Sequence, residues 1–426
     1  MPADVIEHSG REEVCTARAA RYAAVRRFSE RLAAPLSPED QTVQSMPDVS
    51  PTKWHLAHTT WFFETFILTR FDPAYRPFDS HYGYLFNSYY EAAGPRHPRP
   101  QRGLLSRPGV DEIVAYRRHV DCAMGELLAR SAAPAPALHD LLELGINHEQ
   151  QHQELILMDI KHVLSVNPLR PAYQTAVSRN AGRVPPPEWI CFDGGLVEIG
   201  HDGRGFAFDN EGPRHRVWLE PFALASRLVT CGEYLEFIAD DGYRRPEFWL
   251  SEGWAAVTTR GWTAPLYWEE EGGRWHVFTL AGQRPIAADE PVCHVSFYEA
   301  AAYAKWVGKR LPGEAEWEHA AAGVPLQGHV ADSGVLHPLP APTQPGLQQM
   351  IGDAWEWTAS PYVAYPRYRE PAGAIGEYNG KFMANQMVLR GGAAVTPPDH
   401  IRITYRNFFP PDARWMFSGI RLAEDL

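Results

Sequence analysis

The chain has 426 residues, more than one ordinary hydrophobic core accommodates, so two domains are expected. Hydrophobic residues make up 45%, aromatic residues 12% and charged residues 22% of the sequence, which is typical of a soluble globular protein. The net charge of -12 and the scattered Lys and Arg residues argue against nucleic acid or an anionic membrane as a partner. Small-molecule chemistry is favoured instead.

Four helical segments are predicted in the first part of the chain. They cover residues 11–36, 50–70, 111–130 and 138–166. The second is expected to begin at Ser50-Pro51, where Ser suits the N-cap and Pro the first helical position. Residues 71–108 form a loop too long for a passive connection, so we expect it to serve a site. Together these elements predict a four-helix bundle over residues 1–172.

The composition changes at a Pro-rich stretch that predicts an extended linker over residues 173–189. Beyond it, residues 190–426 show short strands and frequent turns, with helices predicted only at 296–308 and 313–322. The expected fold class is α+β.

A cytoplasmic location is expected. No run of about 18 uncharged apolar residues occurs, and the first residues lack the pattern of a secretion signal. The five cysteines are widely spaced without a CxxC pair and are expected to be reduced. The sequence indicates no oligomeric state.

The segment 148–152 (HEQQH) places His148 and His152 four residues apart on a predicted helix. Such residues lie on one helix face, about 6 Å apart along the axis, so both imidazoles can bind one ion. Neighbouring polar residues such as Asn147, Gln151 and Gln153 can supply the hydrogen bonds that metal ligands require. The pair predicts a catalytic metal, with unliganded helix histidines as the alternative.

The same five residues also match the HExxH pattern of zinc peptidases. That reading requires a third ligand downstream, but Leu155 and Met158 stand where the extended pattern has Gly and His. The third ligand is better sought upstream, where His55 and His58 lie on the second predicted helix. A three-histidine site leaves positions of the ion open to substrate and O2, so an enzyme is expected.

Several separated segments resemble those of the nonhaem iron sulfoxide synthases of ergothioneine biosynthesis, the EgtB type. They are residues 54–64 (WHLAHTTWFFE), 86–90 (FNSYY), 148–154 (HEQQHQE) and 404–411 (TYRNFFPP). Residues 355–358 (WEWT), 389–392 (LRGG) and 419–422 (GIRL) look like signatures of the formylglycine-generating enzymes. The resemblance spans nearly the whole chain. It implies a DinB-like four-helix bundle followed by a C-type-lectin-like domain.

The resemblance also implies a cofactor and a reaction. Fe(II) would be bound by His58, His148 and His152, with His55 as a neighbour. O2 would drive carbon–sulfur bond formation and sulfoxidation between a thiol and hercynine, the trimethylated betaine of histidine. The quaternary ammonium of hercynine cannot donate a hydrogen bond and suits aromatic faces and oxygen dipoles. The residues similar to those of the family that meet it are Gln151, Asn407, Phe408 and Phe409.

Two loop features bear on the thiol donor. Tyr89 and Tyr90 are the expected proton or hydrogen-atom donors, and the pair looks like the branch of the family that uses free cysteine rather than gamma-glutamylcysteine. Among Arg96, Arg99 and Arg102, Arg99 is predicted to bind the donor carboxylate.

Five alternatives remain open. The same reaction with gamma-glutamylcysteine as the thiol donor is the first. A selenoneine synthase, which joins a selenosugar to hercynine, would share this scaffold. A formylglycine-generating oxidase would need paired cysteines near the C-terminus, and none follows Cys293. A zinc peptidase and a noncatalytic lectin-like binding module are the other two, although the module would have no use for the histidines.

Overall fold

The computed structural model describes residues 3–130, 136–177 and 183–426. It divides into two compact units. One consists of Met1–Val166 together with Ala372–Tyr378, and the other of Asn167–Pro371 with Asn379–Leu426. A short segment late in the chain is therefore part of the helical unit.

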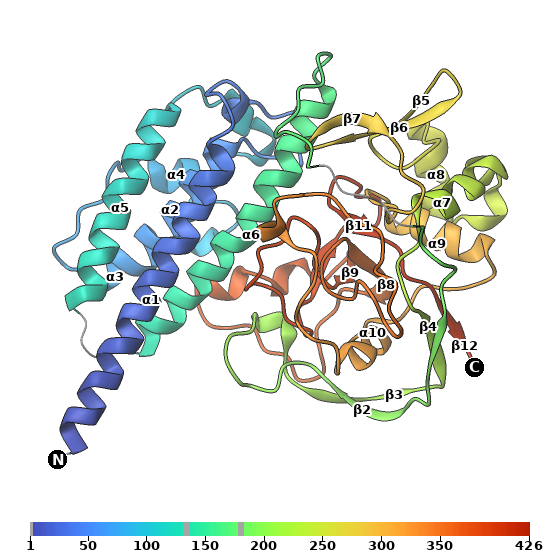
Figure 1. Ribbon diagram of the computed structural model, residues 1–426. Helices are drawn as coiled ribbons and strands as arrows, with labels where there is room; N and C mark the ends of the chain where they lie inside the picture. Colours follow the sequence, from blue (N-terminus) through green and yellow to red (C-terminus); the bar gives the residue numbers. More distant parts are fainter. Residues whose placement is uncertain (1–2, 131–135, 178–182) are drawn as a thin grey trace. The chain divides into compact units, whose positions relative to one another are not determined.

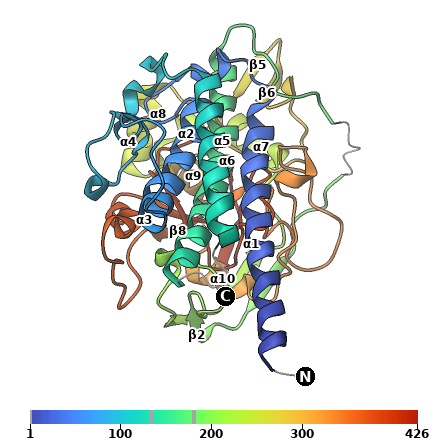
Figure 2. The ribbon, with the colours of Figure 1, turned by 90° about the vertical axis from the view of Figure 1, so that its left-hand side faces the viewer.

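The helical unit is the predicted four-helix bundle (Figure 1). Its long helices are α1 (Ala3–Ala33), α2 (Thr52–Phe63), α5 (Val110–Arg130) and α6 (Pro136–Val166). Both α1 and α2 contact α5 and α6, and Figure 2 shows α1 beside α5. Short helices are α3 (Thr69–Phe71), α4 (Tyr82–Phe86) and the 3-10 turns Asp40–Thr42, Glu91–Ala93 and Arg99–Leu104. No helix among the described residues is long and apolar enough to cross a membrane.

Helix α2 is buried along its whole length, from Thr52 to Phe63. A helix enclosed on all sides must provide partners for its polar side chains, which makes its histidines informative. The predicted start was wrong, because Pro51 rather than Ser50 precedes the first helical residue. The Ser50 hydroxyl instead accepts a hydrogen bond from Arg102. The helix continues into a π-helical turn, Glu64–Leu68, a feature often found at functional sites.

Helices α2 and α6 approach closely at Gly145, about one turn before His148. A Cβ atom on Gly145 would lie 2.6 Å from Cε1 of Phe63, so a side chain at this position would push the helices apart. Glycine in the middle of a helix is unfavourable by about 1 kcal/mol relative to alanine, and here it allows the close approach.

The described residues of the second unit form four small sheets. Their strand orders are β1-β4-β12, β10-β9-β8-β11, β2-β3 and β5-β6-β7, all antiparallel except the β8–β11 pair. The strands are β1 (Trp189–Phe192), β2 (Gly195–Ile199), β3 (His215–Leu219), β4 (Phe222–Ala225), β5 (Trp268–Glu271), β6 (Arg274–Thr279), β7 (Gly282–Pro285), β8 (Trp355–Pro361), β9 (Met387–Arg390), β10 (Asn407–Phe409), β11 (Ser418–Gly419) and β12 (Ala423–Asp425).

Both helices predicted for this unit are present, as α9 (Phe297–Trp306) and α10 (Glu314–Ala321). Two more, α7 (Cys231–Ala239) and α8 (Ser251–Arg260), were missed. The start of α7 carried a signal, because Thr230 and Glu233 form a capping box. Five 3-10 turns complete the described part of this unit: Asp209–Glu211, Gly242–Arg244, Pro246–Phe248, Ala331–Ser333 and Gly380–Phe382. A further 3-10 turn, Ala374–Glu377, belongs to the helical unit.

The three short signatures of the second domain meet in its core. Residues 355–358 lie in β8, and residues 389–392 begin in β9, beside it. Arg421 forms a fully buried ion pair with Glu356, at 2.7 Å. A buried carboxylate that lost this partner would be strongly destabilising, which gives these residues a structural role.

Candidate metal centre

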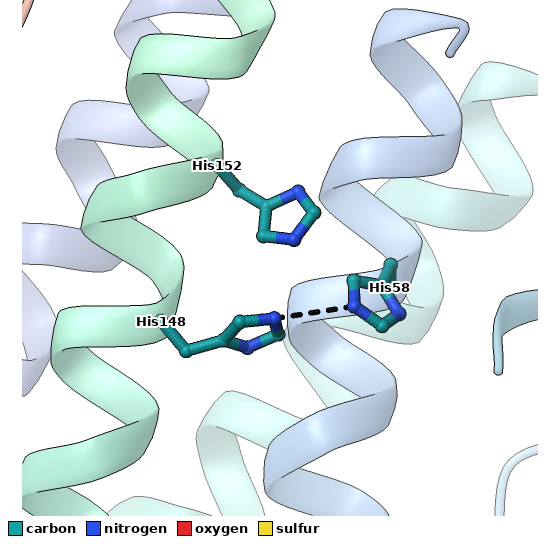
Figure 3. Close-up of side chains that lie close together, drawn as sticks. All are labelled: His58, His148 and His152. Carbon is teal, nitrogen blue, oxygen red and sulfur yellow. Dashed lines mark hydrogen bonds between the residues drawn. The ribbon is translucent and has the colours of Figure 1, made fainter. Parts of the chain in front are cut away.

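Three histidine side chains converge inside the helical unit. His148 and His152 lie one turn apart on α6, and His58 faces them from α2 (Figure 3). One nitrogen of each ring lies within 4.8 Å of those of the other two, and Nε2 of His58 is 3.2 Å from Nε2 of His148. The exposed fractions of His58, His148 and His152 are only 0%, 1% and 9%. The three predicted ligands are thus brought together, away from solvent.

Burial keeps these rings uncharged at neutral pH. It lowers the pKa of His148 from 6.5 to about 3. Burial, followed by repulsion from His148, also holds the pKa of His58 and of His152 well below the usual range. A neutral imidazole offers a lone pair to a metal ion. Three imidazoles without a carboxylate suit a divalent transition metal better than Mg²⁺ or Ca²⁺, so the residues present fit such an ion.

His58 on α2 and His152 on α6 each contact a further residue outside the set of three histidines. Nδ1 of His58 donates to the carbonyl oxygen of Phe86 at 2.6 Å, which leaves Nε2 directed at the other histidines. Trp54 stacks on His58, with ring centroids 4.7 Å apart. His55, the histidine not selected as a ligand, contacts His152 at 2.8 Å between the two Nδ1 atoms.

Glu149, the second residue of the HEQQH segment, is occupied by ion pairs. Its carboxylate lies 2.8 Å from Arg26 of α1 and 3.0 Å from Arg117 of α5, and it accepts a hydrogen bond from Ser29 at 2.7 Å. Burial alone would raise the pKa of Glu149, but the two guanidinium groups hold it at about 2. A zinc peptidase would need this carboxylate beside the metal as a general base. The geometry therefore argues against the peptidase alternative.

Tyr89 and Tyr90 lie on the long loop of the helical unit. Tyr90 is fully buried, its ring centroid 4.7 Å from that of Tyr89 and 5.6 Å from that of Trp61. Burial, and then the neighbouring Tyr89, raises the pKa of Tyr90 well above its usual range, so its hydroxyl remains protonated.

A third tyrosine, Tyr378, was not predicted. Its ring centroid lies 5.6 Å from that of His148, and its hydroxyl donates a hydrogen bond to Oε1 of Gln151. The adjacent Glu377 accepts hydrogen bonds from the amides of Glu91 and Ala92, both at 2.9 Å. These contacts join the segment Ala372–Tyr378 to the loop that carries Tyr90.

The loop arginines differ sharply in environment. Arg99 is exposed, and its guanidinium donates to the carbonyl oxygen of Asp48. Arg102 is 3% exposed, donates to the hydroxyls of Ser50 and Ser88, and lies 3.3 Å above the Trp54 ring. Burial, and then repulsion from Arg99, lowers the pKa of Arg102. Arg102 has no acidic partner within 4.0 Å among the described residues, which makes it a buried cation suited to an incoming anion.

Arg102 also lines a small cavity together with a second buried cation, Lys53. Within the described part of the chain, Lys53 donates hydrogen bonds to two backbone carbonyls, those of Ser106 and Pro108. The other lining residues are mainly apolar: Trp54, Phe86, Leu105, Pro108 and Ile113.

Asn407, Phe408 and Phe409 form strand β10 of the second unit. Phe408 stacks on Tyr362 with ring centroids 4.0 Å apart, and all three β10 residues are half-buried. Their predicted contact with the ammonium of hercynine stays a prediction.

The chain matches two family models. Residues 21–156 match the DinB superfamily, and residues 174–337 and 339–426 match the sulfatase-modifying factor enzyme 1-like domain. The helical DinB domain is thus followed by a β-rich domain like that of the formylglycine-generating enzymes, as expected.

Relatives of similar length match the chain across the residues of both domains. The chain is 32% identical to the hercynine oxygenase of Mycolicibacterium smegmatis, over 90% of this chain and 93% of the relative. It is 33% identical to the hercynine oxygenase of Mycobacterium tuberculosis, over 89% of this chain and 92% of the relative. The formylglycine-generating enzyme of Streptomyces coelicolor is 28% identical and matches only 60% of this chain, with 92% of its own length covered.

Proposed function

Because the chain belongs to the hercynine oxygenase family, we propose that it joins the sulfur of L-cysteine to hercynine, with O2 as the oxidant and Fe(II) as the metal. The product is hercynylcysteine sulfoxide. The chain is an oxygen-dependent oxidoreductase by its family, and the finer assignment of metal and thiol is our proposal. The observation that carries it is the buried set of three neutral imidazoles, His58, His148 and His152.

The proposed reaction balances with O2 as the only oxidant. The S–H bond of the thiol and one C–H bond of the hercynine imidazole break, and a C–S bond and an S–O bond form. The second oxygen atom leaves as water, so four electrons pass to O2. When bound, Fe(II) would supply the one-electron chemistry that O2 requires.

The tyrosines would control the protons of this reaction. Tyr90, protonated and buried, is proposed to donate the proton from its Oη atom to the oxygen that leaves as water, with Tyr89 beside it. Tyr378 lies nearest to His148 and holds Gln151 through its hydroxyl, so it is proposed to orient Gln151 towards hercynine.

The ammonium group of hercynine would be met by aromatic faces and oxygen dipoles. Gln151, together with Asn407, Phe408 and Phe409, is proposed for this role on the family resemblance. A trimethylammonium group has no hydrogen to donate, so amide oxygens and aromatic rings stabilise it through its charge alone.

For the carboxylate of the thiol donor, Arg102 is better supported than the predicted Arg99. Arg102 is buried and has no acidic partner in the described ranges of the chain, whereas Arg99 is exposed. Burial is the main cause of the low pKa of His58 and of His152, and the charge of Arg102 is one of the smaller contributions that lower the pKa of both. A carboxylate bound there would compensate a charge that the fold leaves unpaired, and the charge-assisted bond would be strong.

A side-by-side donor assay tests the proposal. The Fe(II)-loaded protein receives O2, hercynine and one donor at a time: cysteine, gamma-glutamylcysteine or a selenosugar. Mass spectrometry should find hercynylcysteine sulfoxide, with kcat/KM highest for cysteine. A higher kcat/KM for gamma-glutamylcysteine or the selenosugar would overturn the choice of donor. No product from any of the three would overturn the proposed reaction.

A further inference from the structure

We propose that His55 and Asp159 act together to fix the tautomer of the metal ligand His152 and so keep its metal-facing nitrogen unprotonated. The proposal rests on the proposed metal site and adds two positioning residues to it. Nδ1 of His55 lies 2.8 Å from Nδ1 of His152, and Nε2 of His55 lies 3.0 Å from Oδ2 of Asp159. The three side chains thus form a continuous chain of hydrogen bonds that ends at the metal site.

The hydrogen bonds that join Asp159, His55 and His152 are buried. His55 is 2% exposed and Asp159 is 3% exposed, so water has little access to either group. Both ring nitrogens of His55 are used, one on each neighbour. A contact between two imidazole nitrogens is a hydrogen bond only when one carries a proton and the other does not. The proposal therefore depends on which of the two imidazoles, His55 or His152, donates the proton in their hydrogen bond.

Asp159 determines that His152 is the donor and His55 the acceptor. The carboxylate oxygen of Asp159 accepts the hydrogen bond from Nε2 of His55, so Nε2 carries the proton of this ring and its Nδ1 becomes an acceptor. His152 must then carry its own proton on Nδ1, which leaves the lone pair of Nε2 free for the metal. Asp159 is itself held in place, since its Oδ2 accepts a hydrogen bond from the backbone amide of Ser50 at 2.7 Å.

The three ligands are supported in different ways. The carbonyl oxygen of Phe86 fixes the tautomer of His58, because a carbonyl also only accepts. Nδ1 of His148 has no hydrogen-bond partner among the described residues. His152 is the ligand whose neighbour can act either as donor or as acceptor. Without Asp159, His55 could donate from Nδ1 and shift the proton of His152 to Nε2, where it would block the metal.

The tautomer can be measured directly in the full chain. Protein labelled with ¹⁵N-histidine and loaded with Zn(II), which is diamagnetic, gives ¹⁵N chemical shifts that distinguish the two tautomers. We expect His55 as the Nε2–H form and His152 with its proton on Nδ1. Observation of His55 as the Nδ1–H form would overturn the proposal.

Metal affinity supplies a second readout, with Fe(II) or Zn(II) titrated against a chromophoric chelator. His55→Phe removes the acceptor and should weaken binding about 10- to 100-fold. Asp159→Asn keeps an acceptor oxygen but removes the charge, so the loss of metal affinity should be smaller than that of His55→Phe. The double variant should bind no more weakly than His55→Phe, because Asp159 acts only through His55.

His139→Phe is the matched control. His139 is on the same helix and contacts Arg18 of α1, so replacing it should leave metal affinity unchanged. Wild-type affinity in His55→Phe, or additive losses in the double variant, would overturn the proposal while the metal site stands. A wild-type chain that binds no metal would instead overturn the proposed function.

Discussion

The carboxylate of Glu149 lies 2.8 Å from the guanidinium of Arg26, and both side chains are buried. Glu149 stands where a zinc peptidase carries its general base, yet its charge is bound to α1 and α5 rather than directed at the histidines. The HExxH pattern here therefore combines two functions on one helix. The histidines face the proposed metal site, and the glutamate forms ion pairs that hold the bundle together.

Glu149→Gln should cost about 3 to 5 kcal/mol of stability, because it leaves Arg26 and Arg117 buried without their charge partner. Glu143→Gln is the control, since the Glu143–Arg21 pair is about one-third exposed and worth about 1 kcal/mol or less. Urea denaturation measures both. A Glu149→Gln variant with wild-type stability but no turnover would show that the carboxylate takes part in the chemistry.

Tyr90→Phe should shift the product from sulfoxide towards oxidation of cysteine alone, because the proton donor is removed. A loss in sulfoxide formation of about 100-fold or more is expected for a general acid. Mass spectrometry gives the partition between the two products. Tyr89→Phe and Tyr378→Phe belong in the same series, and Tyr303→Phe, a buried tyrosine of the second unit, is the control. An unchanged partition at both Tyr89 and Tyr90 would remove their proposed role.

Arg102→Gln should raise the KM for the thiol by about 10- to 150-fold, the range for loss of a hydrogen bond to a charged group. The KM for hercynine should change much less. Arg99→Gln tests the original expectation directly, and Arg118→Gln, an exposed arginine of α5, is the control. A larger effect at Arg99 than at Arg102 would restore Arg99 as the carboxylate ligand.

The metal-free protein should lose stability as the pH falls below about 6.5. Between that value and the pKa of about 3 for folded His148, the unfolded chain binds a proton that the folded chain does not. His148→Gln should reduce the pH slope of the unfolding free energy by up to about 1.4 kcal/mol per pH unit. Urea midpoints from pH 7.5 to 4 measure the slope. An identical slope in wild type and variant would contradict the depressed pKa.

Local sequence patterns predicted the helices that carry the proposed metal site. The spacing of His148 and His152 was sufficient, because both lie on one helix and helical geometry fixes their relation. The position of His58 depended on the family resemblance. Both His55 and His58 are buried on α2, and only the packing of α2 on α6 separates ligand from neighbour.

Those local patterns could not predict contacts between segments that are far apart in the sequence. Tyr378 follows Gln151 by 227 positions, and no periodicity relates them. The ion pair of Glu149 with Arg26 joins residues 123 positions apart, so the pattern alone left the peptidase reading open. Arg99 and Arg102 are the same residue type on the same predicted loop, and only the fold distinguishes the exposed side chain of Arg99 from the buried one of Arg102.

Metal content tests the central claim most directly. Wild type, His58→Ala, His148→Ala and His152→Ala are loaded anaerobically with Fe(II), desalted and assayed for bound iron and for turnover of hercynine with cysteine. The account predicts about one iron per chain in wild type, and loss of both tight iron binding and turnover in each variant. A folded variant of any of the three histidines that retains wild-type iron binding and turnover would contradict it.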